Sequence, residues 1–218
     1  MDGSKSYHHG DLRAALLMAA EQELDATGIE GFSLRKVAKR AGVSHAAPAH
    51  HFGDVRGLLT ALAALGFERL VRMGEAEAAA LGEDDPRGRA LAYGLAYAEF
   101  AARHTALFRL CFSSGRPDFE DAALKEASDG AFLRLAGLVA EMNGRPLEFS
   151  ALGLAHAYAV WAVTHGAADL LASGKMDHLA SLDKATRAAA IRALIAPALD
   201  TPPDLVAGGS AGHGTAAR

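Results

Sequence analysis

The strongest constraint on the fold of this chain comes from residues 32–52, FSLRKVAKRAGVSHAAPAHHF. The first half of this stretch predicts a short helix, because apolar residues recur at helical spacing after Ser33, a good N-cap residue. Gly42 is predicted to end that helix, since glycine takes the positive φ of a tight turn at little cost. Ser44 is then predicted to cap a second helix. Two short helices joined in this way form a helix-turn-helix, a spacing that purely structural helical hairpins share.

The composition favours helices over strands along the rest of the chain. Alanine and leucine supply 79 of the 218 residues, whereas valine, isoleucine and threonine together supply 18. Alanine and leucine lose little free energy on entering a helix, while β-branched residues lose side-chain freedom there. We therefore expect an all-α protein with essentially no sheet. Periodicity and breakers predict nine helices, at about 11–26, 33–42, from 44, 55–81, 86–103, 104–112, 119–142, 148–173 and 182–199.

These helices divide into a smaller basic group and a larger apolar group. We expect a three-helix helix-turn-helix domain over residues 7–54 and a six-helix domain over 55–200. The last stretch, 201–218, is rich in Gly, Pro, Ser and Ala. Because it has almost nothing to bury, it is predicted to be a disordered tail.

Charge is unevenly distributed along the chain. The whole chain carries a net charge of −4, yet residues 33–56 hold five basic residues and one aspartate, a net charge of +4. Residues 57–218 carry a net charge of −4. A basic patch on an acidic body is typical of a protein in which one small region meets an anionic partner. A solvated basic helix face would give the same pattern.

Targeting and redox signals favour a cytoplasmic protein. The first residues lack the apolar core of a signal peptide, and no segment approaches the roughly 18 apolar residues of a membrane span. Cys111 is the single cysteine, which excludes an internal disulfide and a cysteine-based zinc site. Its place in an apolar stretch indicates a core residue rather than an oxidant sensor.

Pro48 and the nearby histidines raise the question of a broken helix or a metal site. In a helix that begins at Ser44, the proline stands at the end of the first turn and removes at most the first intrahelical hydrogen bond. We therefore expect the helix to survive with an irregular start. His45, His50 and His51 do not share one helical face at i, i+4 spacing, so we expect no metal site and no cofactor.

The second helix of the hairpin carries groups that suit a DNA duplex. Ser44, His45, Ala46 and Ala47 are predicted to lie at its N-terminal end, where a recognition helix meets base edges and phosphates. His45 can donate a hydrogen bond to a base acceptor, and the alanine methyl groups can contact a thymine methyl. The hairpin is therefore predicted to bind double-stranded DNA.

Two stretches resemble the N-terminal region of TetR-like transcriptional repressors: YHHGDLRAALLMAA at 7–20 and GFSLRKVAKRAGVSHAAPAHHFGDVRGLL at 31–59. The resemblance implies a homodimer that binds a palindromic operator and is released by a small, largely apolar effector. Together with the charge pattern, it predicts DNA contacts from Ser33, Arg35, Lys36, Ser44, His45, Ala46, Ala47, His50 and Arg56. The family usually has a tyrosine at position 49 and a lysine at position 55, both of which contact phosphate. Here these positions are Ala49 and Val55.

The larger domain, 55–200, is expected to bind the effector. The stretch WAVTHG, 161–166, resembles the Trp-x-x-x-His-Gly signature of one TetR subgroup's ligand-binding domain. Aromatic residues at helical spacing, several with polar tips, predict a small-molecule cavity, while a plain apolar core would explain most of them as well. The candidate ligand residues are Tyr93, Tyr97, Phe108, Phe112, Tyr158, Trp161 and His165.

By the same resemblance, the last two predicted helices form a four-helix interface between two copies of the chain. Both carry small residues that permit close packing: Ala155, Ala159, Ala162, Ala189 and Ala193. A two-fold dimer presents its two reading helices about 34 Å apart, or a multiple of that distance.

Two other functions stay open. One is a helical interaction or ligand-sensing module with weakened DNA binding, which Ala49 and Val55 make conceivable. The other is a small helical enzyme. We expect no enzyme, because the sequence offers no nucleophile, base and orienting group that belong together.

Overall fold

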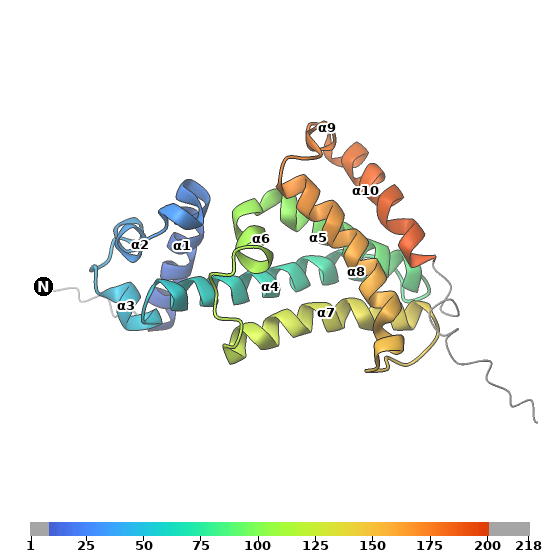
Figure 1. Cartoon of the computed structure of the whole chain (residues 1–218), viewed down its shortest axis with the longest axis horizontal. Helices are drawn as coiled ribbons and strands as arrows, with labels where there is room; N and C mark the ends of the chain where they lie inside the picture. The colour runs from blue at the N-terminus through green and yellow to red at the C-terminus, as the bar shows by residue number, and fades with distance from the viewer. Residues whose placement is uncertain (1–8, 201–218) are drawn as a thin grey trace, which may run out of the picture. The chain divides into compact units, whose positions relative to one another are not determined.

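The computed structural model describes residues 9–200 of the chain. Within that range all regular secondary structure is helical, which confirms the all-α prediction (Figure 1). The described helices are α1 (His9–Gly31), α2 (Leu34–Ala41), α3 (Ala47–Phe52), α4 (Val55–Ala79), α5 (Pro86–Arg103), α6 (Thr105–Phe112), α7 (Ala122–Met142), α8 (Ala151–Ala172), α9 (Asp177–Ala180) and α10 (Lys184–Leu199). The predicted tail, 201–218, lies outside the described residues.

The chain forms two compact units. The first comprises the described residues up to Val71 together with Arg103–Ala131. The second comprises Arg72–Ala102 and the described residues from Phe132 onward. Each unit therefore combines separate stretches of sequence, and α4 and α7 each contribute one part to each unit.

In the first unit, α2 packs against both α1 and α3, and the chain runs from α3 into α4 (Figure 1). Their apolar faces meet in a core whose largest fully buried side chains include Leu16, Leu24, Leu58 and Leu62. Helix α1 also packs against α6. Helices as short as α2 and α3 are marginal on their own in water, so this tertiary packing is what stabilises the hairpin.

Gly28 divides α1 into two helical segments, close to the end that the sequence predicts near residue 26. The residue takes a positive φ of 65°, but its ψ of 179° lies outside the left-handed helical region. The second segment follows this kink and ends at Gly31. The predicted end of the first helix therefore agrees with the structure, and the sequence missed only the short segment that follows.

The second helix of the hairpin, α3, begins at Ala47 and not at the predicted Ser44. Its N-cap is Ala46, which has no side-chain cap, and Ser44 lies in the preceding turn, where its carbonyl oxygen accepts a hydrogen bond from the Ala47 N–H at 3.0 Å. Pro48 explains the shift. In a helix that begins at Ala47 the proline occupies the first turn, where a missing N–H leaves no intrahelical bond unmade. The capping role predicted for Ser44 is wrong, while the helix tolerates the proline as predicted.

In the second unit, α5, α8, α10 and the second part of α7 enclose a continuous apolar core. The core includes Leu91, Leu138, Val160 and Ile195, none more than 3 % exposed. Helices α8 and α10 pack side by side (Figure 1). This unit therefore has a core of its own, which supports the helices that carry the predicted effector and dimer residues.

Helix boundaries in the rest of the chain agree closely with the sequence pattern. Helix α5 begins at Pro86 and ends at Arg103, as predicted. The sequence missed the four-residue helix α9, so the nine predicted helices become ten in the described part of the chain. No helix within residues 9–200 combines the length and the apolar character needed to span a membrane.

Candidate nucleic-acid interface and effector site

Helix α2 is fixed at both ends as the sequence predicts. Ser33 has an extended backbone, and its side chain accepts a hydrogen bond from the Lys36 N–H at 3.4 Å, which makes it the N-cap. Gly42 follows the helix in the left-handed region, at φ 69° and ψ 30°, where a residue with a Cβ would be strained. These two caps set the length of α2 and the direction in which the chain continues toward α3.

A nearly buried carboxylate, Glu23, ties α2 to α1. Its side chain is 4 % exposed, and Oε2 accepts hydrogen bonds from Arg40 Nη2 at 2.9 Å and from Arg40 Nε at 3.3 Å. Lys36 Nζ lies 3.6 Å from the other oxygen, Oε1, and donates to the Gly31 carbonyl at 3.0 Å. Burial by itself would raise the pKa of Glu23, but the hydrogen bond from Arg40 and the nearby positive charges outweigh it and lower the pKa. Glu23 is therefore ionised at neutral pH.

The surface of the hairpin runs from the turn before α3 to the end of that helix. Pro48 is buried and anchors the start of α3 in the unit. The predicted DNA-contact residues of this segment are exposed or half-buried: Ser44, His45, Ala46, Ala47 and His50. The predicted reading residues are therefore accessible to a partner, and their contact with DNA stays a prediction.

The five basic side chains of residues 33–56 are not equally available. Arg35 and Lys39 are exposed and belong to no ion pair in the described part of the chain. Arg56, near the beginning of α4, donates to Asp118 Oδ1 at 3.0 Å. The other two, Lys36 and Arg40, are held by Glu23. The net charge of this segment therefore overstates the number of cations that are free to meet a duplex.

Two of the histidines on this surface lie in contact with each other. The His50 and His51 rings lie edge to face with their centroids 5.5 Å apart. Nowhere in the described part of the chain do three His, Cys, Asp or Glu side chains lie close enough together to hold a metal ion.

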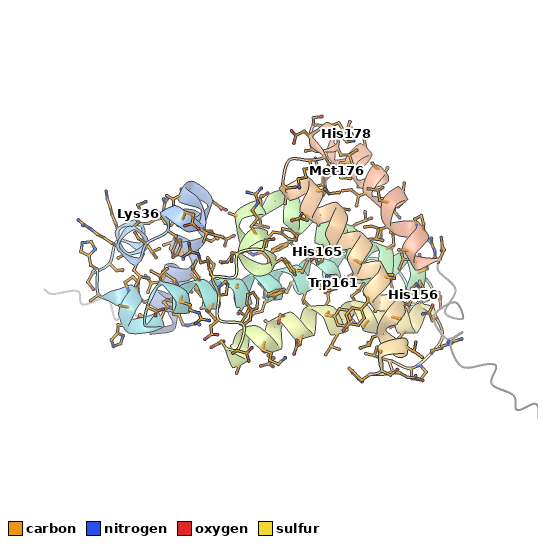
Figure 2. The ribbon with its side chains drawn as sticks, viewed as in Figure 1. Lys36, His156, Trp161, His165, Met176 and His178 are labelled. Atoms are coloured by element: carbon orange, nitrogen blue, oxygen red, sulfur yellow. The ribbon has the colours of Figure 1, made fainter. Side chains whose placement is uncertain are left out.

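In the second unit, α5, α7 and α8 bring five rings together in what we term the aromatic row: Tyr97, His165, Trp161, Phe132 and Tyr158. Tyr97 and His165 share a hydrogen bond of 2.7 Å between the hydroxyl oxygen and Nδ1. His165 and Trp161 follow one another along α8, with ring centroids 5.7 Å apart (Figure 2). Phe132 meets Trp161 edge to face and stacks on Tyr158 at 4.7 Å. Four of the predicted ligand residues therefore lie in one contiguous cluster, and Phe132 joins them.

The other three predicted ligand residues lie apart from the aromatic row. Tyr93 is buried against α4, where a Cβ added to Gly74 would lie 2.4 Å from its ring. Phe108 and Phe112 belong to the first unit, and Phe112 packs against both Phe108 and Phe67 with ring centroids 5.0 Å apart. The structure therefore supports these three residues as core packing, and their part in ligand binding stays a prediction.

The first unit also contains an open cleft of about 580 Å³ between α1, the end of α3, α4 and the segment before α7. At its wall, the guanidinium carbon of Arg13 lies 5.2 Å from the centre of the Phe52 ring. None of the seven predicted ligand residues lines this cleft. The effector prediction therefore depends on the aromatic row and not on the cleft.

Helices α8 and α10 carry apolar side chains on the outside of the second unit. The exposed ones include Leu152, Ala159, Ala162 and Val163 on α8 and Ala189, Ala193 and Leu194 on α10. Ala155 is half-buried. We term these exposed side chains the apolar face. A stripe of this kind on packed helices is typical of a protein–protein contact.

A second charged cluster joins α1 to α4 and to the beginning of α6. Arg69 donates to both carboxylate oxygens of Glu21, with 2.7 Å from Nη2 to Oε2, and Arg69 Nη1 lies 3.3 Å from His104 Nδ1. Desolvation and the charge of Arg69 lower the pKa of His104. The sequence pattern does not reveal Glu21 or Glu23, because their partners lie 48 and 17 residues further along the chain.

Comparison with known proteins assigns both parts of the chain. Residues 16–62 match the family described as bacterial regulatory proteins, tetR family. Residues 90–196 match the tetracyclin repressor-like C-terminal domain. Among curated proteins the comparison found no match. The subgroup suggested by WAVTHG stays a prediction.

Solved structures agree with this assignment. A protein of unknown function from Rhodococcus sp. RHA1 is 32% identical with a TM-score of 0.71, over 88% of this chain and 97% of that one. A TetR-like transcriptional regulator from the same source is 17% identical (TM-score 0.59; 89% of this chain, 99% of that one). The TetR family regulator PfmR from Thermus thermophilus is 19% identical (TM-score 0.58; 88% and 96%). The chain belongs to the TetR family of bacterial transcriptional regulators.

Proposed function

We propose that this chain is a ligand-responsive transcriptional repressor that binds a palindromic operator as a homodimer and is released by a small, largely apolar effector. The family assignment supports DNA binding, and regulators of this family are generally not enzymes. Three features of the described residues support the rest: the exposed hairpin, the apolar face of α8 and α10, and the aromatic row.

The observation that carries the proposal is the exposed surface of the hairpin. Caps at Ser33 and Gly42 fix α2, and buried Pro48 anchors α3, so the turn that carries Ser44, His45 and Ala46 lies between two defined helices. His45 offers a hydrogen bond to a base edge, while Arg35 and Lys39 offer cations to the backbone phosphates. A rigid, exposed and locally cationic hairpin is suited to the major groove.

The apolar face supports the proposed dimerisation. Its alanines let helices of two copies approach closely, and its leucines would leave water on association. Because a two-fold contact uses the same surface on both copies, each subunit would present one reading helix to one half of a palindrome.

The effector response is attributed to the aromatic row. It combines apolar rings with the polar pair Tyr97 and His165, the mixture that orients small ligands in pockets. A ligand needs only to favour a dimer whose reading helices are wrongly spaced. A coupling of about 1–3 kcal/mol would lower operator affinity about 5- to 150-fold.

The test is a gel shift with duplex DNA from upstream of the protein's own gene, repeated over a series of salt concentrations. The proposal predicts a shift on one palindromic segment that weakens as salt rises, because phosphate contacts release counterions. A dimer that shifts no duplex, even in dilute buffer, would overturn it.

One observation favours a second candidate, a ligand-sensing module with weakened DNA binding. Three of the five cations in residues 33–56 are already in ion pairs, and Ala49 and Val55 replace the family's usual phosphate contacts. That candidate predicts intact dimers that bind effector but no duplex.

A further inference from the structure

Glu23 on α1 lies close to two basic side chains of α2. Its carboxylate receives Arg40 at 2.9 Å and lies 3.6 Å from the Lys36 ammonium, while the Gly31 carbonyl takes a hydrogen bond from that same ammonium. Oε1, the oxygen nearer to Lys36, has no hydrogen-bond partner in the described structure. One carboxylate on α1 therefore holds two basic side chains of α2 toward the protein.

The two cations would otherwise be available to solvent. The Lys36 side chain is 51% exposed and that of Arg40 is 36% exposed, whereas Glu23 is 4% exposed. Long basic side chains can swing by several ångström when nothing holds them, since their stems are flexible. Without the carboxylate, both could reach a phosphate of a duplex docked on the hairpin.

Free cations strengthen binding to every sequence alike. Phosphate contacts carry no base information, and they supply essentially all of the non-specific affinity. A regulator must find one site among about 10⁶–10⁹ competitors, so stronger binding to every sequence holds more of the protein on non-specific sites. Pairing Lys36 and Arg40 inside the protein limits this non-specific binding.

We propose that Glu23 is a positioning residue, which keeps Lys36 and Arg40 away from DNA phosphates and so limits non-specific binding. It touches no base itself and acts through the two cations. The inference rests on the proposed DNA binding and adds to it the means by which this hairpin limits its affinity for random sequence.

The test compares the wild type with Glu23→Gln on a fluorescein-labelled random-sequence duplex, by anisotropy over a series of salt concentrations. The slope of log K against log salt is negative. Each released cation that gains a phosphate contact makes it steeper, by about 0.9. We expect a slope steeper by about 0.9 to 1.8, together with tighter binding to the random duplex at low salt. A folding defect alone would weaken binding and would not steepen the slope.

Glu30→Gln is the matched control, because Glu30 lies on the same helix, is 85% exposed and pairs with Arg116 rather than with α2. It removes the same charge and should leave the slope unchanged. Arg40→Gln provides a second test in case the Glu23→Gln protein does not fold. Since Arg40 is held by Glu23, its loss should not reduce the slope.

Two results would overturn the inference: a Glu23→Gln slope equal to that of the wild type, or an Arg40→Gln slope lower by about 0.9. Either can occur in a protein that still selects its operator, in which case the proposed function stands. If the wild type binds no duplex at all, the proposed function fails and this inference fails with it.

Discussion

Tyr97 on α5 and His165 on α8 are joined by a hydrogen bond of 2.7 Å between the tyrosine hydroxyl and Nδ1 of the imidazole. Burial lowers the pKa of His165, and the charge of Asp169 opposes this shift without cancelling it. In the neutral ring with its proton on Nε2, Nδ1 accepts the bond from the Tyr97 hydroxyl. The pair forms the polar end of the aromatic row.

The lowered pKa of His165 predicts a pH-dependent contribution to stability. Because the folded state resists protonation of this ring more than the unfolded chain does, the contribution is present above the ordinary pKa of 6.5 and is lost as the pH falls through the folded pKa. Between about pH 7.5 and about pH 5.5, we expect His165→Gln to lose less free energy of unfolding than the wild type does. Urea unfolding at both pH values measures this, and equal losses would contradict the assignment.

Trp161 should report effector binding, because it is the single tryptophan of the chain and lies in the aromatic row. We expect any compound that weakens DNA binding to change the intensity or wavelength of its emission in a titration of the protein alone. Tyr97→Phe keeps the ring and removes the hydroxyl, so it should alter the affinity for effectors with a polar group. Release of DNA with unchanged emission would place the effector elsewhere, for example in the open cleft of the first unit.

Replacing Arg35 and replacing His45 with alanine should affect DNA binding in different ways. Arg35→Ala removes a phosphate contact, so it should weaken binding to all sequences and reduce the salt slope by about 0.9. His45→Ala removes a base contact, so it should relax the preference at one position of each half-site by about 1 kcal/mol. Binding profiles over a library of operator variants distinguish the two, and an unchanged profile for His45→Ala would show that the turn before α3 does not read a base.

Val55→Lys should strengthen DNA binding. Val55 is 38% exposed at the first residue of α4, and the family usually has a phosphate-binding lysine there. One added phosphate contact makes the slope of log K against log salt steeper by about 0.9. Val55→Gln, of similar length and without charge, is the control, and anisotropy over a salt series is the measurement. Equal slopes for the two variants would mean that this position does not face a phosphate.

Ala162→Glu should separate the proposed dimer. Ala162 is exposed on the apolar face of α8, so the change leaves the fold of one subunit intact and buries a charge only on association. Sedimentation equilibrium should give a monomer for this variant. Ala123→Glu, at an exposed alanine of α7 in the first unit, should leave the assembly unchanged. A dimeric Ala162→Glu protein would show that the copies meet through another surface.

The ends of α2 could be predicted from the neighbouring residues, whereas the start of α3 could not. The caps at Ser33 and Gly42 could be predicted because each acts within four residues of the helix end. The start of α3 could not, because Ser44 favours a cap at position 44 whereas Pro48 favours a place in the first turn, and only the structure shows that the helix begins at Ala47.

Long-range pairs account for what the sequence did not reveal. Trp161 and His165 share a helix face, so their i, i+4 spacing brings them together in any α8. Tyr97 and Phe132 reach them only through packing of α5 and α7. The same holds for Glu23, whose partners on α2 are visible only once α1 and α2 are packed.

Selection from a pool of random duplexes, followed by measurement of how many copies bind each recovered site, tests the central claim most directly. The account predicts an inverted repeat bound by two copies, with half-site centres about 34 Å apart or at a multiple of that distance. A pool that yields no enriched sequence at any salt concentration, or one bound by single copies at lone half-sites, would contradict it.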